Sequence, residues 1–367
     1  MKFALYTNSV SAHLLPLAHE IASRIGKENF WYIYTGENLQ GGGQEVASIS
    51  EHDIQIERLD KNNQSILEGC DVLLCGGLRP IELLERRSAQ GLRSFYQSER
   101  WFKPIPLKIM GLKLLLPGRI RMMVPCYRKM AKRFVNLANN DSHFHVLAIG
   151  PWAKADFFAL GIRKDKIEDW GYFVEPSKCF KEEPFNGSHS KDSVLRVLWL
   201  GRMLDWKCVD TIIRAVALAN RHLREEKTES CIKRISLSIY GAGPEEKRLK
   251  KLASSFSDCF PFCDFHPPVS LSKARTLMHE HDIYVLASNE QEGWGATVSE
   301  ALSEGMNCLG TYEAGASAAL LPRNLLFHSG DNQALARLLL KNDITTMGLP
   351  STYTPSGAAD KILSLLG

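Results

Sequence analysis

The sequence predicts an α/β protein built from two doubly wound domains, each with a parallel sheet. Short apolar, β-branched runs alternate with helical patterns, which is typical of parallel sheets covered on both faces. The alternation occurs twice, on either side of a polar stretch without periodicity at residues 176–192. With 367 residues and 44% hydrophobic content, the chain is large enough to bury two ordinary cores.

The first half has the pattern expected of one such domain. A helix is predicted at residues 14–25, after the first apolar strand. The predicted strands are residues 2–6, 31–34, 54–59, 72–75 and 95–98. We therefore expect an N-terminal domain at residues 1–175 and a linker at residues 176–194.

The second half repeats the scheme. The predicted strands are residues 195–200, 235–240, 262–265, 283–287 and 307–309, with helices between them. We expect a second domain at residues 195–350. Residues 351–367 follow it, with a helix predicted at residues 356–366.

The most informative motif lies between the strand at 283–287 and a helix predicted to begin at Thr297. Glu292 and Glu300 lie eight positions apart here, across a turn that contains Gly293 and Gly295. Ligands of open α/β sheets bind at the carboxyl ends of strands, where the amides of a helix start meet an anion. The arrangement suits a sugar nucleotide. An alternative is a capping box, in which Thr297 caps the helix and Glu300 bonds the amide of the cap.

A second motif lies in the loop after the strand at 195–200. This loop begins at Gly201 and carries Arg202 and Lys207. Arginine offers a planar fork of donors and lysine a compact ammonium group, and together they would neutralise a diphosphate leaving group. A lone basic residue on a loop is ordinarily only solvated. Two of them in one strand-to-helix loop favour anion binding.

With these motifs, residues 195–340 resemble glycosyltransferase family 4, whose fold is called GT-B. The resemblance implies two Rossmann-like domains that face each other across a cleft. It implies that Arg202 and Lys207 contact the donor phosphates, that Glu292 lies beside the transferred sugar, and that Glu300 holds the ribose hydroxyls. The donor-binding residues implied by the matched motifs are Gly201, Arg202, Lys207, Gly241, Gly243, Glu292, Gly293, Trp294, Gly295, Thr297, Val298 and Glu300.

The resemblance also implies a reaction. A sugar would be transferred with retention from a nucleoside-diphosphate donor, with UDP favoured, to a glycan acceptor. The acceptor is expected to be lipid-linked and to belong to bacterial-type cell-surface polysaccharide or glycoconjugate assembly. No cofactor and no divalent metal are expected. The N-terminal domain would bind the acceptor, and the helix at 356–366 would cross back to it. Glu99 matches a loop that reaches the donor, and His13 follows the first strand, so either could orient the acceptor hydroxyl.

Three positions depart from the family pattern. Cys208 replaces a usual glycine, which predicts a different backbone geometry at that point. Trp294 takes a position more often held by phenylalanine. Glu313-Ala-Gly315-Ala replaces the usual glycine pair near the diphosphate, so the backbone contacts of that loop are expected to differ. Gly330-Asp331 resembles a later family turn.

Composition excludes several other classes. The net charge is a modest +4, and no uncharged apolar run reaches the ~18 residues of a spanning helix. The N-terminus has no signal-peptide pattern, so a cytoplasmic protein is expected. The nine cysteines form no paired CxxC blocks; Cys259 and Cys263 have no second pair, and no metal site is predicted. Glu246 replaces the third glycine of a dinucleotide fingerprint, which argues against a nicotinamide enzyme.

Residues 101–136 are strongly basic, with nine Lys or Arg and no Asp or Glu. Apolar residues are interleaved with the cations, which suits an anionic membrane surface, and we expect a peripheral contact with the inner face of the cytoplasmic membrane. One alternative is an ordinary helix pair packed on the sheet. Another is RNA binding through Trp101, Phe102, Tyr127 and Phe134, but no nucleic-acid module accompanies them, and no nucleic-acid partner is expected.

Two other functions fit the same architecture. A nucleotide-sugar epimerase would bind the same donor without an acceptor. A non-catalytic homologue would bind the nucleotide without turnover. The basic pair together with both glutamates favours transfer over either alternative.

Overall fold

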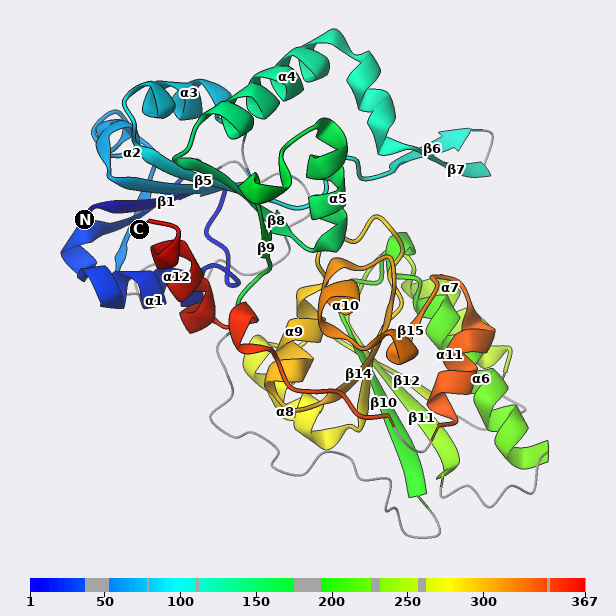
Figure 1. Cartoon of the computed structure of the whole chain (residues 1–367). Helices are drawn as coiled ribbons and strands as arrows, with labels where there is room; N and C mark the ends of the chain where they lie inside the picture. Colours follow the sequence, from blue (N-terminus) through cyan, green and yellow to red (C-terminus); the bar gives the residue numbers. More distant parts are fainter. Residues whose placement is uncertain are drawn as a thin grey trace. The chain divides into compact units, whose positions relative to one another are not determined.

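The computed structural model describes residues 1–36, 53–77, 79–109, 112–174, 193–225, 232–256, 262–341 and 344–366. The chain divides into two compact units, Met1–Glu175 with Ser351–Gly367 and Pro176–Pro350 (Figure 1). Each unit is built on one parallel sheet with helices on both faces, which confirms the predicted fold class. Most of the predicted linker, residues 176–192, lies outside the described residues.

The sheet of unit 1 has seven parallel strands in the order β3-β2-β1-β4-β5-β8-β9. Its inner strand β1 is fully buried, as its apolar sequence Phe-Ala-Leu-Tyr-Thr requires. The strands are β1 (Phe3–Thr7), β2 (Phe30–Tyr34), β3 (Gln55–Arg58), β4 (Val72–Gly76), β5 (Arg93–Ser98), β8 (Phe144–Ile149) and β9 (Ile167–Trp170).

Helices cover both faces of this sheet. One face carries α1 (Leu15–Ile25) and α12 (Pro355–Ser364), which pack against each other. The other face carries α2 (Gln64–Gly69), α3 (Ile81–Ala89), α4 (Pro125–Asn140) and α5 (Pro151–Leu160). Short 3-10 turns are η1 (Lys27–Asn29), η3 (Gly118–Met123), η4 (Lys164–Lys166) and η8 (Ser351–Tyr353).

The C-terminal helix α12 is fixed to unit 1 by specific polar contacts. Arg24 of α1 forms an ion pair with Asp360, and its guanidinium also donates to Ser356 Oγ at 2.8 Å. Lys361 pairs with Glu168 of β9 at 2.9 Å. The chain therefore ends on the unit in which it begins.

Two features of unit 1 differ from the sequence prediction. Strands β8 and β9 were not predicted, because a short apolar run is ambiguous and β9, with the sequence Ile-Glu-Asp-Trp, is half charged. The helix-pair alternative for the basic segment is confirmed only for the second part of that segment, where α4 packs its apolar face on the core and leaves Lys129 and Lys132 exposed. The first part of the segment is instead an antiparallel hairpin of β6 (Ile105–Ile109) and β7 (Leu112–Leu116), which projects from the body of the unit (Figure 1). Pro106 has no N–H to donate, so it disfavours a helix there.

The core of unit 1 is centred on aromatic rings. Phe134 of α4 contacts the rings of Tyr96, Trp101 and Phe157 at centroid distances of 4.8, 4.9 and 6.2 Å. Trp101, Phe102 and Phe134 are all buried, so these three side chains cannot stack on nucleic-acid bases. The basic segment is thus anchored by its own aromatic residues.

The sheet of unit 2 has six parallel strands in the order β12-β11-β10-β13-β14-β15. Its strands are β10 (Ser193–Leu200), β11 (Ile232–Tyr240), β12 (Cys263–His266), β13 (Ile283–Leu286), β14 (Asn307–Thr311) and β15 (Leu326–Phe327). All five predicted strands of this half are present, and only the two-residue edge strand β15 was not predicted.

Helices again lie on both faces of this sheet (Figure 1). The longest, α6 (Val209–Glu225), packs with α11 (Asn332–Leu339) over the core of the unit. The other helices and 3-10 turns are α7 (Glu246–Ser254), α8 (Leu271–Glu280), α9 (Ala296–Ser303), α10 (Gly315–Leu320), η5 (Asp205–Lys207) and η7 (Arg323–Leu325). Among the described residues, no helix has both the length and the apolar character needed to cross a membrane.

We predict that Phe134→Ala destabilises unit 1 by about 3–5 kcal/mol, because a buried aromatic ring is lost and a cavity remains. The matched control is Phe158→Ala on α5, where the ring is 66% exposed and little stability should be lost. Urea unfolding followed by tryptophan fluorescence measures both variants. Similar losses in the two variants would contradict the assignment of Phe134 to the core.

Candidate functional site

The strand order of unit 2 brings two loops together at one edge of the sheet. The chain runs outward from β10 to β12, then returns to place β13 beside β10. Such a reversal leaves a crevice at the carboxyl ends of the two strands, where ligands of open α/β sheets bind. The loop after β10 carries Arg202 and Lys207, and the loop after β13 carries Glu292.

Lys207 and Glu292 meet at this reversal. The two side chains form an ion pair and are only 18% and 13% exposed. Lys207 is the last residue of η5, and the backbone ties the two loops as well, since the amide of Asn289 donates to Trp206 O at 2.9 Å. A partly desolvated ion pair has a better defined position than a solvated one, because fewer waters compete for the charges. Arg202 lies in the same loop and is exposed.

Cys208 keeps the backbone conformation that a glycine would adopt. Its φ of 48° and ψ of 40° lie in the left-handed region, and among the described residues no other non-glycine has a positive φ. The expected change of backbone geometry at this position is therefore wrong. The conformation is unfavourable for an L-residue by an order of 1 kcal/mol, and it directs the chain from η5 into α6.

Gly241 and Gly243 are explained by close packing of backbone. A Cβ on Gly241 would lie 1.8 Å from the carbonyl oxygen of Gly201. The amide of Met203 donates to Ala242 O at 2.8 Å, which holds the turn after β11 against the loop after β10. These glycines position the loop of Arg202, and a direct contact with the donor stays a prediction.

The start of α9 differs from the capping-box alternative. Gly295, with a φ of 88°, is the N-cap residue, so Thr297 already lies within the first turn of the helix. The capping box is therefore wrong, because the left-handed glycine starts the helix two residues earlier than that motif requires. The amide of Val298 donates to Gly295 O at 3.1 Å, so this amide is already engaged within the helix.

Trp294 is buried beneath the Gly293–Gly295 turn and holds this turn in place. The indole is fully buried and donates to Ser299 Oγ at 3.0 Å. Its main-chain carbonyl accepts from the amide of Ala316 at 2.7 Å, and Gly293 O accepts from Gly315 at 3.2 Å. The start of α10 is thereby bonded to the Gly293–Gly295 turn. Trp294 can fix this turn, whereas its ring cannot contact a ligand in this arrangement.

The divergent loop near α10 is occupied by contacts within unit 2. The carboxylate of Glu313 accepts from the amide of Ser329 at 3.1 Å and lies 3.0 Å from His328 Nδ1. Asp331, after Gly330, accepts from the amide of Ala334 and caps α11. The turn that resembles a family motif therefore has a structural role as a helix start.

Glu300 is an unusually placed carboxyl group. Its side chain is buried, and this burial raises its pKa to about 7, although the charge of Arg275 opposes the shift and that of Glu304 adds to it. Glu304 is itself paired with His279 at 2.8 Å and with Arg275 at 3.4 Å. Buried carboxyl groups with a raised pKa are found more often at functional sites than elsewhere, so Glu300 stays a candidate for a ligand contact.

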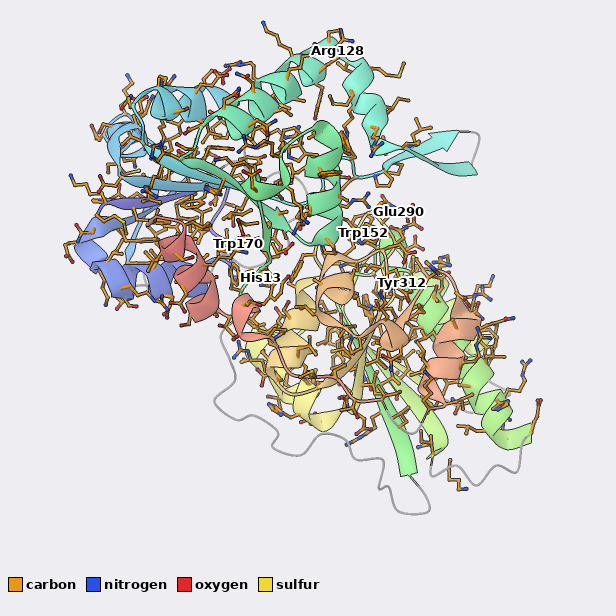
Figure 2. All side chains as sticks on the ribbon, viewed as in Figure 1. His13, Arg128, Trp152, Trp170, Glu290 and Tyr312 are labelled. Carbon is orange, nitrogen blue, oxygen red and sulfur yellow. The ribbon has the colours of Figure 1, made fainter. Side chains whose placement is uncertain are left out.

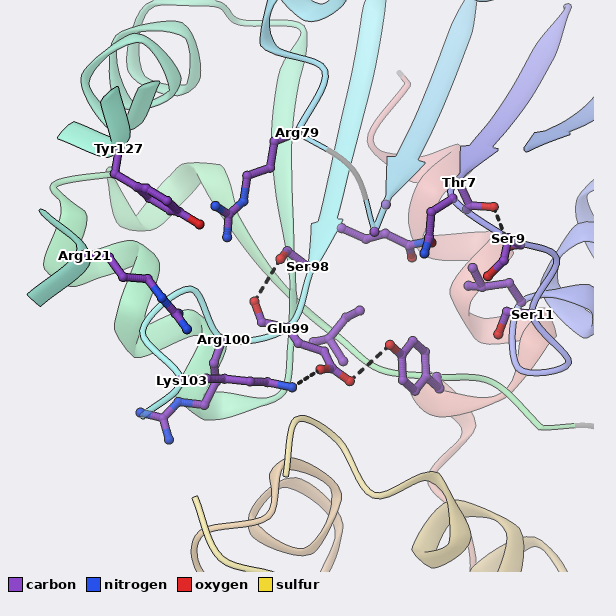
Figure 3. A pocket seen from close by; sticks show the side chains of 17 residues that line it. Thr7, Ser9, Ser11, Arg79, Ser98, Glu99, Arg100, Lys103, Arg121 and Tyr127 are labelled. Atoms are coloured by element: carbon purple, nitrogen blue, oxygen red, sulfur yellow. Dashed lines mark hydrogen bonds and ion pairs between the residues drawn. The ribbon is translucent and has the colours of Figure 1, made fainter. Parts of the chain in front are cut away.

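Unit 1 contains a pocket at the corresponding place in its own sheet. Its strand order reverses between β1 and β4, and the pocket, of about 490 Å³, lies at the carboxyl ends of these strands and of β5 (Figure 3). Glu99 lines it, directly after β5. Its carboxylate accepts from Tyr172 Oη at 3.1 Å and from Lys103 Nζ at 2.5 Å.

His13 lies behind this pocket wall. Its ring stacks on Tyr172 at a centroid distance of 5.6 Å, and its main-chain oxygen accepts from the amide of Phe173. Burial lowers the pKa of His13 to about 4, so the imidazole is neutral at neutral pH. Tyr172 thus links the two predicted residues of the N-terminal unit, with Glu99 in the pocket and His13 behind it.

The pocket residues that sequence reasoning missed include Arg79, Arg121 and Tyr172. Arg79 had a usable signal, because it follows β4 closely and the ends of parallel strands meet at one sheet edge. Arg121 and Tyr172 had no usable signal in the sequence, since they come from η3 and from the segment after β9.

Among the residues that the structure describes, no cluster of three or more His, Cys, Asp or Glu side chains could hold a metal ion.

We predict that stability falls between pH 5 and pH 8 through Glu300. A raised pKa means that the folded protein binds more protons than the unfolded chain above about pH 4.5, so stability decreases as the pH rises towards 7 and beyond. Glu300→Gln removes this titration. At pH 8 the variant should be more stable than the wild type by an order of 2 kcal/mol, and near pH 5 the two should be similar.

Thermal unfolding at both pH values measures this difference. Glu280→Gln, which changes a 52% exposed glutamate on α8, is the matched control and should follow the wild type. A Glu300→Gln variant whose Tm difference from the wild type is the same at pH 5 and pH 8 would contradict the assignment.

Comparisons with known proteins agree with this geometry. Residues 180–342 match the family model described as Glycosyl transferases group 1. An uncharacterized glycosyltransferase of Methanocaldococcus jannaschii is 24% identical over 183 residues, which are 49% of this chain and 41% of that protein. The chain thus spans about two fifths of the length of this curated relative.

Solved structures cover the whole chain. The apo form of the lipopolysaccharide outer core galactosyltransferase WaaB superposes with a TM-score of 0.68 at 14% identity, over 100% of this chain and 99% of that one. Anabaena HepE in complex with UDP gives 0.59 at 15% identity, over 100% and 97%. The chain therefore has a GT-B fold, and residues 180–342 are the part that matches the group 1 family model.

Proposed function

We propose that the protein transfers a sugar from a nucleoside-diphosphate donor bound by unit 2 to a glycan acceptor bound by unit 1. The observation that carries this proposal is the meeting of Lys207 and Glu292 at the strand-order reversal of unit 2, with Arg202 in the same loop. HepE structures in complex with UDP and with UDP-glucose support a nucleotide-sugar donor, and they favour UDP.

Charge placement supplies the catalysis in this proposal. When the bond between the sugar and the diphosphate breaks, negative charge grows on the departing phosphate. The ammonium group of Lys207 and the guanidinium of Arg202 stabilise that charge, and such groups act strongly where water is partly excluded. Glu292 holds Lys207 in place before the donor binds and lies where the transferred sugar is expected.

The donor's ribose is assigned to Glu300. A carboxylate accepts hydrogen bonds from two neighbouring hydroxyls, and these bonds favour its ionised form, so nucleotide binding should lower the raised pKa of Glu300. We assign no covalent nucleophile, because the Glu292 carboxylate is already engaged by Lys207. Retention of configuration and independence from metals follow from the family 4 resemblance and belong to this proposal; NMR of the product anomer would test the first.

Lys207→Ala should lower the transfer rate by ~100-fold or more, because one positioned charge is removed from the leaving group. The donor is first identified by the thermal shift that UDP, GDP and dTDP each produce. Turnover of the corresponding sugar nucleotide is then measured. Lys273→Ala, which removes an equally charged but 50% exposed side chain from α8, is the control and should behave like the wild type.

The outcomes separate the alternative functions. Conversion of the donor sugar without any acceptor would favour an epimerase. Nucleotide-dependent stabilisation without turnover would favour a non-catalytic homologue. If none of the nucleotides raises the Tm of the wild type, the proposed donor site is wrong.

We further propose that the protein works in the cytoplasm at an anionic membrane, on which a lipid-linked acceptor in cell-surface polysaccharide or glycoconjugate assembly would be presented. The supporting feature is an exposed face of η3 and α4, here called the basic face. Ile120, Met123 and Val124 on it are 40%, 78% and 47% exposed. Figure 2 shows Arg128 on the outer side of α4. The cations of the basic face are Arg119, Arg128, Lys129 and Lys132, all exposed.

This face combines the two signals that peripheral membrane binding needs. Exposed apolar side chains enter the boundary between headgroups and acyl chains, while basic residues bind anionic lipids with about 1 kcal/mol each. Arg133 does not take part, because it pairs with Glu82 and Glu85 of α3 at 2.8 and 2.5 Å.

The double variant Arg128→Ser, Lys129→Ser should bind anionic vesicles ~30-fold more weakly than the wild type, because two surface charges are lost. Sedimentation with phosphatidylglycerol-containing vesicles at low salt measures this. Met123→Ser should also weaken binding, whereas Met347→Ser, at an 84% exposed methionine of unit 2, is the control. Wild-type protein that stays in the supernatant would contradict the proposal.

A further inference from the structure

The pocket of unit 1 is strongly cationic. Four basic side chains line it, and Glu99 is the one acidic residue among the lining residues that the structure describes. The cations come from three separate parts of the chain: Arg79 follows β4, Arg100 and Lys103 follow β5, and Arg121 belongs to η3. Like charges that converge on one cavity repel each other, so a compensating anion stabilises their placement.

Two of the four cations are compensated within unit 1. Lys103 pairs with Glu99 at 2.5 Å, and Arg100 lies 3.7 Å from Asp156, whose side chain is 9% exposed. These pairs leave the net charge of the pocket to the other two guanidinium groups.

Arg79 and Arg121 have no carboxylate partner among the described residues. The guanidinium of Arg79 lies over the rings of Trp101 and Tyr127, at 4.8 and 5.3 Å from their centroids. Arg121 donates to the main-chain oxygen of Trp101 at 3.2 Å. Aromatic stacking and a carbonyl contact hold the two groups in place without neutralising them, so their charge is available to a ligand.

The rest of the pocket has different chemistry. Figure 3 shows Thr7, Ser9 and Ser11 on the side opposite Arg79 and Arg121. Thr7 is buried and its hydroxyl donates to Ser9 O at 2.8 Å, whereas Ser9 and Ser11 are partly exposed. The hydroxyl groups of these two serines can both donate to and accept from the hydroxyls of a sugar. The pocket thus has one end suited to an anion and one end suited to a sugar, within a volume of about 490 Å³.

We propose that this pocket binds an acceptor that carries a phosphoryl group, with Arg79 and Arg121 on the phosphoryl oxygens. A phosphoryl group carries a charge of about −1.5 to −2 and three acceptor oxygens, which match two guanidinium forks. A carboxylate carries only one charge and would leave one of the two cations uncompensated. This inference rests on the proposed function, because it names the acceptor class of that transfer.

The test compares sugars that share one ring and differ in charge. Unit 2 is first saturated with the nucleoside diphosphate that gives the largest thermal shift, so that its own cations cannot bind the probe. Glucose 6-phosphate, glucuronate and glucose are then titrated by calorimetry at one ionic strength. Glucose 6-phosphate should bind at least ~10-fold more tightly than either of the other two.

Substitutions locate the binding. Arg79→Gln and Arg121→Gln should each weaken glucose 6-phosphate binding by ~10-fold and leave glucose binding unchanged. Arg86→Gln is the control, because it removes an arginine of α3 that is 53% exposed and pairs with Glu68. Circular dichroism melting of the variants verifies that each one is folded. A short-chain lipid diphosphate sugar, titrated in parallel, shows whether a phosphate ester or a lipid-linked diphosphate is preferred, and tighter binding than glucose by either supports the inference.

Three results would overturn it: binding of both phosphorylated probes that is no tighter than that of glucose and glucuronate, equal behaviour of the pocket variants and Arg86→Gln, or a loss of nucleotide affinity in the pocket variants. The last result would assign Arg79 and Arg121 to the donor. Failure of the proposed function is recognised separately, because it appears as a wild-type protein that binds no nucleotide, and glucose 6-phosphate can still be titrated against that protein.

Discussion

The reversal of strand order in each parallel sheet is the constraint on which both sites depend. Parallel strands need crossover helices, so loops at their carboxyl ends leave on opposite faces wherever the order reverses. In unit 2 this geometry brings the loops after β10 and β13 together, and the ion pair of Lys207 and Glu292 joins them. In unit 1 the same reversal, between β1 and β4, opens the pocket that Glu99 lines. In both units, the reversal of strand order therefore places polar side chains at the carboxyl edge of a buried sheet.

Several residues that resemble ligand contacts act instead on the backbone. Gly241 permits the turn after β11 to approach Gly201, and Trp294 is buried under the turn it belongs to. Cys208 adopts the left-handed conformation at the end of η5 without being a glycine. Each of them fixes the path of a loop that carries a charged side chain. The interaction energy of two charges depends on their distance, so the position of the loop determines how strongly its charged side chain interacts with a partner.

The basic segment shows how one feature of a sequence can serve several purposes in space. In the sequence, its nine cations indicate a single basic surface. In the structure, Lys103 and Arg121 line the pocket of unit 1, Arg133 fastens α4 to α3, and the cations of the basic face are exposed beside apolar side chains. The aromatic residues of the segment are mostly core. The charge count predicted an anionic membrane surface, and it could not show that Lys103 and Arg121 line a cavity instead.

The sequence by itself determined the fold class, the five main strands of unit 2 and the loops that hold Arg202, Lys207 and Glu292. These follow from local patterns, because a buried parallel strand must be apolar and its polar residues must come at its ends. Tertiary structure alone decided that Lys207 pairs with Glu292 across 85 positions and that Glu300 is buried beside Glu304. It also decided that the helix start lies at Gly295 and that Arg79 and Arg121 converge on one pocket. Residues far apart in the chain approach each other, and lose the water around them, only when the sheet is assembled. Their separation and their burial together determine which side chains are charged.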